Sequence, residues 1–430
     1  MHAIEGFFRR RFGREALYLP SGRLGLYLVF REWLRPGDRL LMSPVNDDVV
    51  FFTVLAAGLV PVLAPIDPHT GNIDPTAIDD PTWARLHAVM TTNLYGLPDR
   101  MDVLEERSRR HGLLLLEDAC QAFDSWFGGR RIGNFGTVAV YSLSKHVGGV
   151  GGVVTFSEAR QRERLARRAK DELRYRSLPM ATACRVRALL STVGASTQPR
   201  RWLARLRDHL VPRAAERSGH RIPYTVPEVL QAQNEGGGLD SFDRWVRIDN
   251  PAYRTWPLRS SVRTTLKRLE AFEKNRHLRL AGTGKLLELG HTPSSLPVPR
   301  DTALFRVPLF VQEREKVITH FAQRGLMLDY IYDPPLDLYA PGLAETLPSP
   351  PAARIWSRDV LPVDPVLAGR FLELFRDSPG FCLPSREAVR SDPVTADQNT
   401  LVIRLSTSSA RGGPDEQGSS AFDRRGPICP

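Results

Sequence analysis

The sequence has few cysteines and no long apolar segment. Its 430 residues include four cysteines, and these lie far apart in the chain: Cys120, Cys184, Cys382 and Cys429. This spacing excludes a dense disulfide framework and matches no metal-ligand motif, so we expect reduced thiols in a cytoplasmic protein without a metal site. No apolar run is long enough to span a bilayer, and the first residues lack the apolar core of a signal peptide.

Helix and strand patterns alternate through the first part of the chain. The apolar spacing predicts helices at 24–34, 49–57 and 101–110, and strands at 40–43, 60–64, 88–92, 113–116 and 138–141. A further long helix is expected at about 260–280. Such alternation implies an α/β fold, in which helices cover both faces of a mostly parallel sheet.

Polar residues follow two neighbouring strands of this predicted sheet. The run Leu113–Leu116 ends in Glu117 and Asp118, and the run Val138–Tyr141 leads through Ser142 to Lys145. Because open α/β sheets bind ligands at the carboxyl ends of their strands, a carboxylate and an amine are expected at one edge. Such a carboxylate can keep a ring nitrogen protonated and such an amine can form a Schiff base, as pyridoxal phosphate requires.

This stretch resembles the DegT/DnrJ/StrS family of sugar aminotransferases, which are fold type I pyridoxal-phosphate enzymes. Several other segments also resemble motifs of the family and follow one another in the family's order. The similar segments are a Ser-Gly phosphate turn at 19–23, a Pro-Gly-Asp strand at 35–44, and segments at 57–62, 66–75, 93–102, 117–122, 324–325 and 332–336. The resemblance is nearly continuous from residue 17 to 156 and resumes more weakly from about 253 to 374.

The resemblance assigns roles to individual residues. It implies that Lys145 is the catalytic residue that carries pyridoxal 5'-phosphate, and that Asp118 pairs with the pyridine nitrogen. Gln121 would lie near the phenolic oxygen of the cofactor. The phosphate would be held by Ser142, Gly22 and Arg23.

The resemblance also implies a domain organisation. A large cofactor-binding domain with a mostly parallel sheet of the seven-stranded type is expected at 1–260, and it includes a basic helical insertion at about 160–250. A small α+β domain is expected at 261–384. Residues 385–430 are rich in Ser, Asp, Gly and Pro, and we expect them to be disordered.

The activity implied is transfer of an amino group from glutamate or glutamine to a keto-sugar, usually nucleotide-linked, for polysaccharides or secondary metabolites. A homodimer is expected, with 252–254 reaching across to the other subunit. Two alternatives remain: a sugar dehydratase on the same scaffold, and a degenerate cofactor-binding member with a regulatory or anionic-surface-binding role. Departures from the family pattern at Arg23, at 45–48 and at Ala252 keep the second alternative open, whereas Lys145 argues against the first.

Positive charge is concentrated in one segment. Residues 160–221 hold 17 Lys and Arg against five Asp and Glu, a net charge of +12, and the whole chain carries +11. Apolar residues at helical spacing between the arginines favour solvated helix faces. The alternative is a surface for a nucleotide-sugar pyrophosphate, a lipid-linked phosphate or an anionic membrane. No nucleic-acid recognition motif accompanies the charge.

Overall fold

The computed structural model describes residues 1–175, 218–290, 292, 296, 298, 299, 301–347 and 351–376. The tail expected at 385–430 and residues 176–217 of the basic insertion lie outside these residues. Within the described ranges, no helix combines the length and the apolar character that crossing a membrane would need.

The central element is a mixed sheet of eight strands in the order β1-β9-β8-β5-β4-β2-β3-β11. From β8 to β11 all neighbouring strands are parallel, and β9 is antiparallel to both β8 and β1. The strands are β1 Glu15–Leu19, β2 Arg39–Met42, β3 Val60–Leu63, β4 Ala88–Thr91, β5 Leu114–Asp118, β8 Val138–Ser142, β9 Gly152–Phe156 and β11 Glu345–Thr346. The expected fold class is confirmed, but the sheet has one strand more than expected, because β11 from the C-terminal part pairs with β3.

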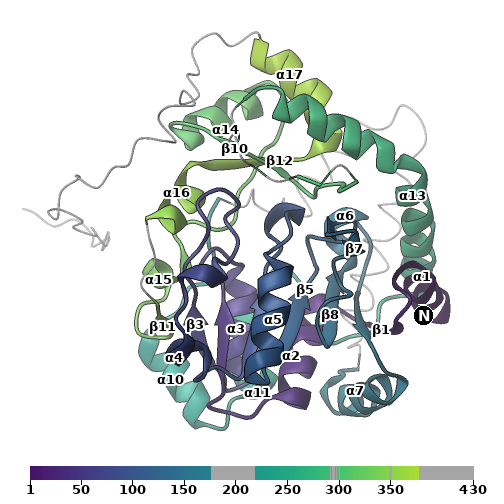
Figure 1. Ribbon diagram of the computed structural model, residues 1–430. Coiled ribbons are helices and arrows are strands. Elements are labelled where there is room, and N and C mark those ends of the chain that lie inside the picture. The colour runs from purple at the N-terminus through teal and green to yellow at the C-terminus, as the bar shows by residue number, and fades with distance from the viewer. Residues whose placement is uncertain are drawn as a thin grey trace, which may run out of the picture. The chain divides into compact units, whose positions relative to one another are not determined.

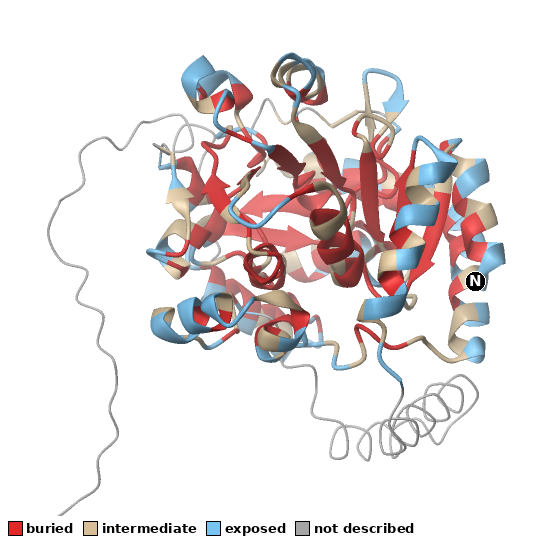
Figure 2. Cartoon of the chain, turned by 90° about the horizontal axis from the view of Figure 1, so that it is seen from below, coloured by how far each residue is buried: buried red, intermediate tan, exposed pale blue. Residues whose placement is uncertain are grey.

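Both faces of the sheet are buried under helices (Figures 1 and 2). Consecutive residues of one strand enter different cores: Leu116 lies in the core on one face and Leu115 in the core on the other. The first core is covered by α2 Gly22–Trp33, α3 Asp48–Ala56, α7 Ala159–Glu172, α10 Val226–Asn234, α11 Gly238–Ser241 and α12 Asp243–Val246. The second is covered by α1 His2–Phe12, α4 Asp80–Trp83, α5 Met101–His111 and α13 Arg259–Leu287. Burial on both faces explains why these strands are continuous apolar runs in the sequence.

A third core belongs to the C-terminal part. It is built from the antiparallel pair β10 Val307–Phe310 and β12 Val360–Val363, with α14 Arg314–Gln323, α16 Ala352–Asp359 and α17 Ala368–Arg376. The short α15, Leu336–Tyr339, instead packs through Leu336 on the first core. The expected domain boundaries at 260 and 384 stay predictions.

Candidate active site

The two strand ends that carry the expected site residues are adjacent. β5 and β8 are parallel neighbours, with Asp118 opposite Val140, and both end at the same edge of the sheet. Asp118 is the last residue of β5 and Ser142 the last of β8. Lys145 follows on α6, Leu143–His146, which begins directly after β8 (Figure 1). The structure therefore brings Asp118, Ser142 and Lys145 to one edge.

Asp118 is a buried carboxylate close to a cation. Burial raises the pKa of Asp118, whereas hydrogen bonding by Cys120 and the charge of Lys145 lower it and Asp47 raises it. Its Oδ1 accepts a hydrogen bond from the main-chain N–H of Cys120 at 3.0 Å, and its carbonyl oxygen accepts one from the Asn93 side chain at 3.3 Å. The first contact holds the carboxylate and the second holds the main chain at the strand end, where the carboxylate can accept a hydrogen bond from a protonated base.

Lys145 is the amine at this edge. A quarter of its side chain is exposed, so a ligand can reach it, and its Nζ lies 3.9 Å from Oδ2 of Asp47. The hydroxyl groups of Ser142, which precedes the short helix, and Ser144, which lies in it, are 2.9 Å apart. Two hydroxyl groups and an ammonium group can bind an anionic ligand here.

The expected phosphate turn lies beside these residues. Ser21 caps α2 by accepting a hydrogen bond from Leu24 N at 3.2 Å. A Cβ atom on Gly22 would lie 3.4 Å from Sγ of Cys120 and 3.5 Å from Cβ of Ser142, so Gly22 is a neighbour of both. Gly152 of β9 approaches the turn so closely that a Cβ atom there would lie 2.5 Å from Gly22 N. Two glycines thus let strand and turn backbones meet beside the site.

Arg23 is engaged by another part of the chain. Its guanidinium group donates hydrogen bonds to the carbonyl oxygens of Val246 at 2.5 Å and Ile248 at 2.6 Å, at the end of α12. These carbonyls give Arg23 a structural role, and the geometry offers no support for its expected contact with a phosphate. That contact stays a prediction.

Gln121 joins the strand end to the C-terminal part. Its side-chain oxygen accepts a hydrogen bond from Tyr95 N at 3.1 Å, and its amide nitrogen donates one to the Tyr332 hydroxyl at 2.7 Å. Tyr332 lies within the segment that resembles the small domain of the family. Sequence reasoning placed Gln121 at the site but did not identify Tyr332 as its partner, because 211 residues separate the two.

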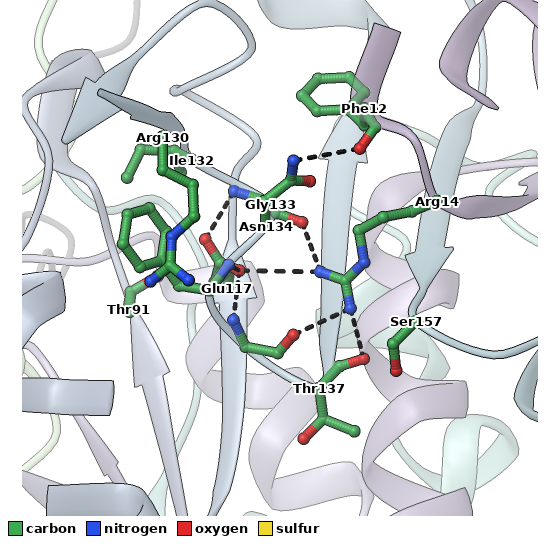
Figure 3. A network of polar contacts seen from close by, with 12 residues as sticks. Phe12, Arg14, Thr91, Glu117, Arg130, Ile132, Gly133, Asn134, Thr137 and Ser157 are labelled. Atoms are coloured by element: carbon green, nitrogen blue, oxygen red, sulfur yellow. Dashed lines mark hydrogen bonds and ion pairs between the residues drawn. The ribbon is translucent and has the colours of Figure 1, made fainter. Parts of the chain in front are cut away.

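Glu117 acts on the loop before β8 (Figure 3). Its buried carboxylate accepts hydrogen bonds from the main-chain N–H groups of Gly133, Phe135 and Gly136 at 2.5–2.7 Å. Arg14 lies 4.0 Å away and donates to three carbonyl oxygens of the same loop. Glu117 therefore fixes the loop that leads into β8, while its neighbour Asp118 faces the candidate site.

The segment 252–254 is held within its own chain. Tyr253 accepts a hydrogen bond on its carbonyl oxygen from the Ser21 hydroxyl at 2.8 Å. Arg254 is buried and pairs with Glu172 at 2.6 Å and with Asp240 at 2.5 Å. The expected reach of this segment to another subunit therefore has no support in these contacts, and the homodimer stays a prediction.

Three arginines in the described part of the basic insertion bind other residues of the chain. Arg164 and Arg168 of α7 both pair with Glu32, at 2.6 and 2.9 Å, and Arg162 donates to the carbonyl oxygen of Ala16 at 2.9 Å. These contacts favour an ordinary packed helix for α7. The expected anion-binding surface otherwise falls on 176–217, outside the described residues.

Part of the chain matches the model of a known protein family. Residues 13–194 match the model of the DegT/DnrJ/EryC1/StrS aminotransferase family. This match covers less than half of the chain, and it is this part of the chain that is similar to the family. The family and its structural neighbours bind pyridoxal phosphate.

Three curated relatives illustrate the range of the family. The chain is 35% identical over 157 residues to a dTDP-3-amino-3,4,6-trideoxy-alpha-D-glucose transaminase of Streptomyces venezuelae, which is 35% of this chain and 41% of the relative. It is 32% identical over 127 residues to a pleiotropic regulatory protein of Geobacillus stearothermophilus, covering 29% and 34%. It is 34% identical over 164 residues to a dTDP-4-dehydro-2,6-dideoxy-D-glucose 3-dehydratase of Saccharopolyspora spinosa, covering 35% and 36%. The chain thus covers less than half the length of these relatives.

The fold extends over more of the chain than the sequence similarity does. The crystal structure of S. venezuelae DesV in complex with a ketimine intermediate has a TM-score of 0.56 and 23% identity, and the match covers 88% of this chain and 89% of DesV. At this identity the likeness concerns the fold alone.

Proposed function

We propose that the protein is a pyridoxal-phosphate-dependent aminotransferase. The observation that carries the proposal is the meeting of Asp118 and Lys145 at adjacent strand ends beside the Gly22 turn. The residues fit the cofactor, because a buried carboxylate, a partly exposed amine and a turn without side-chain bulk lie at one edge. The match of residues 13–194 to the aminotransferase family model supports the same conclusion.

Each residue would have a separate task. Pyridoxal phosphate, when bound, supplies the electron sink for breaking a bond at the carbon that bears the amino group. Lys145 would attach the cofactor and then move a proton at its Nζ. Asp118 would keep the pyridine nitrogen protonated, because its buried carboxylate has few other partners for its charge. Gly22 and Ser142 would bind the phosphate.

We propose a keto-sugar, in particular a nucleotide-linked one, as the acceptor and glutamate or glutamine as the donor. The substrates named for the S. venezuelae transaminase support the sugar class. An aminated sugar of this kind would serve polysaccharide or secondary-metabolite biosynthesis.

A sugar dehydratase is the second candidate, because the S. spinosa relative is a dehydratase with comparable identity. Lys145 favours the aminotransferase, since in the dehydratase branch a histidine replaces this lysine. A degenerate regulatory member is the third, and the G. stearothermophilus relative supports it. The three differ in one measurable step, the half-reaction with an amino donor.

The test has two parts. The purified full chain, incubated with pyridoxal phosphate and reduced with borohydride, should carry the pyridoxyl group on Lys145 in peptide mass mapping. Mixing the loaded protein with glutamate or glutamine should then change its visible absorbance as the amino group is transferred. A label on another lysine would overturn the site. A correct label without the half-reaction would overturn the aminotransferase and favour the other two candidates.

A further inference from the structure

The side-chain amide of Gln121 is held at both ends. Gln121 follows Asp118 by three residues, in the turn after β5. Its Oε1 accepts a hydrogen bond from the main-chain N–H of Tyr95 at 3.1 Å, and its Nε2 donates one to the hydroxyl oxygen of Tyr332 at 2.7 Å. A main-chain N–H group can only donate, so the amide oxygen must face Tyr95 and the amide nitrogen must face Tyr332. These two buried contacts therefore fix which end of the amide lies where.

The loop that supplies the N–H group of Tyr95 is itself fixed in an uncommon conformation. Tyr95 has a φ of 59°, in the left-handed region that residues other than glycine seldom adopt. The residues before it are held by buried side chains. Asp99 accepts a hydrogen bond from Asn93 N at 2.8 Å. Asn72 accepts one from Leu94 N at 2.8 Å. Because such a backbone persists only where its surroundings hold it, the donor to the amide oxygen has a set position.

The acceptor for the amide nitrogen comes from the C-terminal part of the chain. Tyr332 is buried, and its ring centroid lies 5.8 Å from that of Tyr95. Its segment is joined to the loop before α3 by a hydrogen bond of 2.9 Å from Leu336 N to the carbonyl oxygen of Pro44. The orientation of the Gln121 amide thus depends on a hydroxyl group that the packing of this segment brings to the turn after β5.

We propose that Tyr332 is a positioning residue for Gln121, which makes the amide present an N–H donor, and not a carbonyl oxygen, to a ligand at the candidate site. An amide nitrogen carries two hydrogens, and Tyr332 accepts one of them, so the amide keeps a second one for a ligand. Such a donor fits a negatively charged oxygen, and the phenolic oxygen of pyridoxal phosphate is one. The inference deepens the proposed function and rests on it, because it concerns the same cofactor site.

The competing explanation is that Tyr332 only packs the C-terminal part against the sheet. Tyr339 offers a matched case, because its hydroxyl donates to the carbonyl oxygen of Ile222 at 2.6 Å and so serves packing elsewhere. Tyr332→Phe and Tyr339→Phe each remove one hydroxyl group and keep the ring. Only the first change takes away the acceptor of the Gln121 amide.

The experiment compares two ligands that differ at one oxygen. The full chain, freed of cofactor, is titrated with pyridoxal phosphate and with 3-deoxypyridoxal phosphate, which lacks the phenolic oxygen, and both dissociation constants are measured by fluorescence. The intrinsic difference between the two compounds is the same for every variant, so a change in the ratio of the constants reports the contact with this oxygen. Tyr332→Phe should reduce the preference for pyridoxal phosphate about tenfold, the size expected for a hydrogen bond to a charged group. Its affinity for the deoxy compound, and both affinities of Tyr339→Phe, should match the parent.

A double-mutant cycle separates positioning from direct contact. Gln121→Leu should lose the same preference, and adding Tyr332→Phe should cost no more of it. A further loss in the double variant would show that Tyr332 contacts the cofactor itself and would overturn the proposal. An equal loss of affinity for both compounds in Tyr332→Phe would also overturn it, because packing alone would produce that result.

A second variant leaves Tyr332 intact, in case Tyr332→Phe fails to fold in thermal unfolding. Gln121→Glu keeps an acceptor for the N–H group of Tyr95 but offers no N–H to a ligand, so it should lose the preference for pyridoxal phosphate. A preserved preference would overturn the proposal. Failure of the parent to bind either compound would refute the proposed function itself. A parent that binds both, with a ratio that neither Tyr332→Phe nor Gln121→Glu changes, would refute the role of Tyr332 and Gln121 alone.

Discussion

His146 and Gln121 are joined by a hydrogen bond of 2.8 Å between the imidazole Nε2 and the main-chain oxygen of Gln121. Burial lowers the pKa of His146 to about 3, so the ring is neutral and its Nε2–H donates to the carbonyl oxygen. His146 follows Lys145 on α6, and Gln121 lies three residues after Asp118. This bond therefore ties helix α6, which carries the candidate catalytic lysine, to the turn that follows the carboxylate at the end of β5.

The first prediction concerns the pH dependence of stability. Folded His146 takes up a proton near pH 3, whereas an unfolded histidine does so near 6.5, so the stability it contributes is fully present above 6.5 and is lost as the pH falls toward 3. At pH 4.5 the loss is about 3 kcal/mol. Urea unfolding at pH 8 and 4.5 should show a smaller acid loss for His146→Gln than for the parent. His69→Gln, at an exposed position, is the control and should behave as the parent does.

A second prediction concerns Asp118. Asp118→Asn keeps the shape of the side chain but removes the charge that would keep the pyridine nitrogen protonated. The half-reaction with an amino donor should slow by at least ~100-fold, a barrier increase of about 2.7 kcal/mol, in stopped-flow absorbance. Cofactor retention should change less, because Lys145 and the phosphate turn remain. An unchanged rate would reduce Asp118 to the role of capping the following turn.

Local pattern was sufficient to predict the strand ends. The apolar runs before Asp118 and Lys145 are continuous because both faces of the sheet are buried. The two runs follow one another along the chain, and they form parallel neighbours in the sheet. The helix expected at 260–280 likewise lies within α13. These features depend on residues that are near one another in the sequence.

Contacts between distant segments could not be predicted in this way. The bond from Gln121 to Tyr332 and the pairing of β11 with β3 depend on how the C-terminal part packs against the sheet. The ion pair of Asp47 with Lys145 joins the N-cap of α3 to α6, and no spacing rule links two residues that are 98 positions apart. The hydrogen bonds of Arg23 to the carbonyl oxygens of Val246 and Ile248 could not be predicted for the same reason. These carbonyls are more than 200 residues away in the sequence.

A third prediction concerns Glu117, which holds the loop before β8. In Glu117→Gln an amide N–H₂ group would face main-chain N–H donors, and the buried network around Arg14 would lose its counter-charge. The free energy of unfolding should fall by about 3 kcal/mol. Glu105→Gln removes an exposed ion pair with Arg130 and should cost less than ~1 kcal/mol. Equal effects of the two changes in denaturant unfolding would show that Glu117 does not hold the loop.

The last prediction concerns the close approach of β9 to the phosphate turn. In Gly152→Ala the added methyl group would lie 2.5 Å from Gly22 N, so strand and turn must separate. Because Gly22 would bind the cofactor phosphate, the dissociation constant of pyridoxal phosphate should rise at least ~10-fold, or about 1.4 kcal/mol, in a fluorescence titration. Gly284→Ala is the matched control, since a methyl group there meets no atom within 4 Å and the site is helical. That variant should bind the cofactor as the parent does and gain slightly in stability, because alanine favours a helix more than glycine does. If Gly152→Ala binds the cofactor with the affinity of the parent, the turn at Gly22 is not where the phosphate sits.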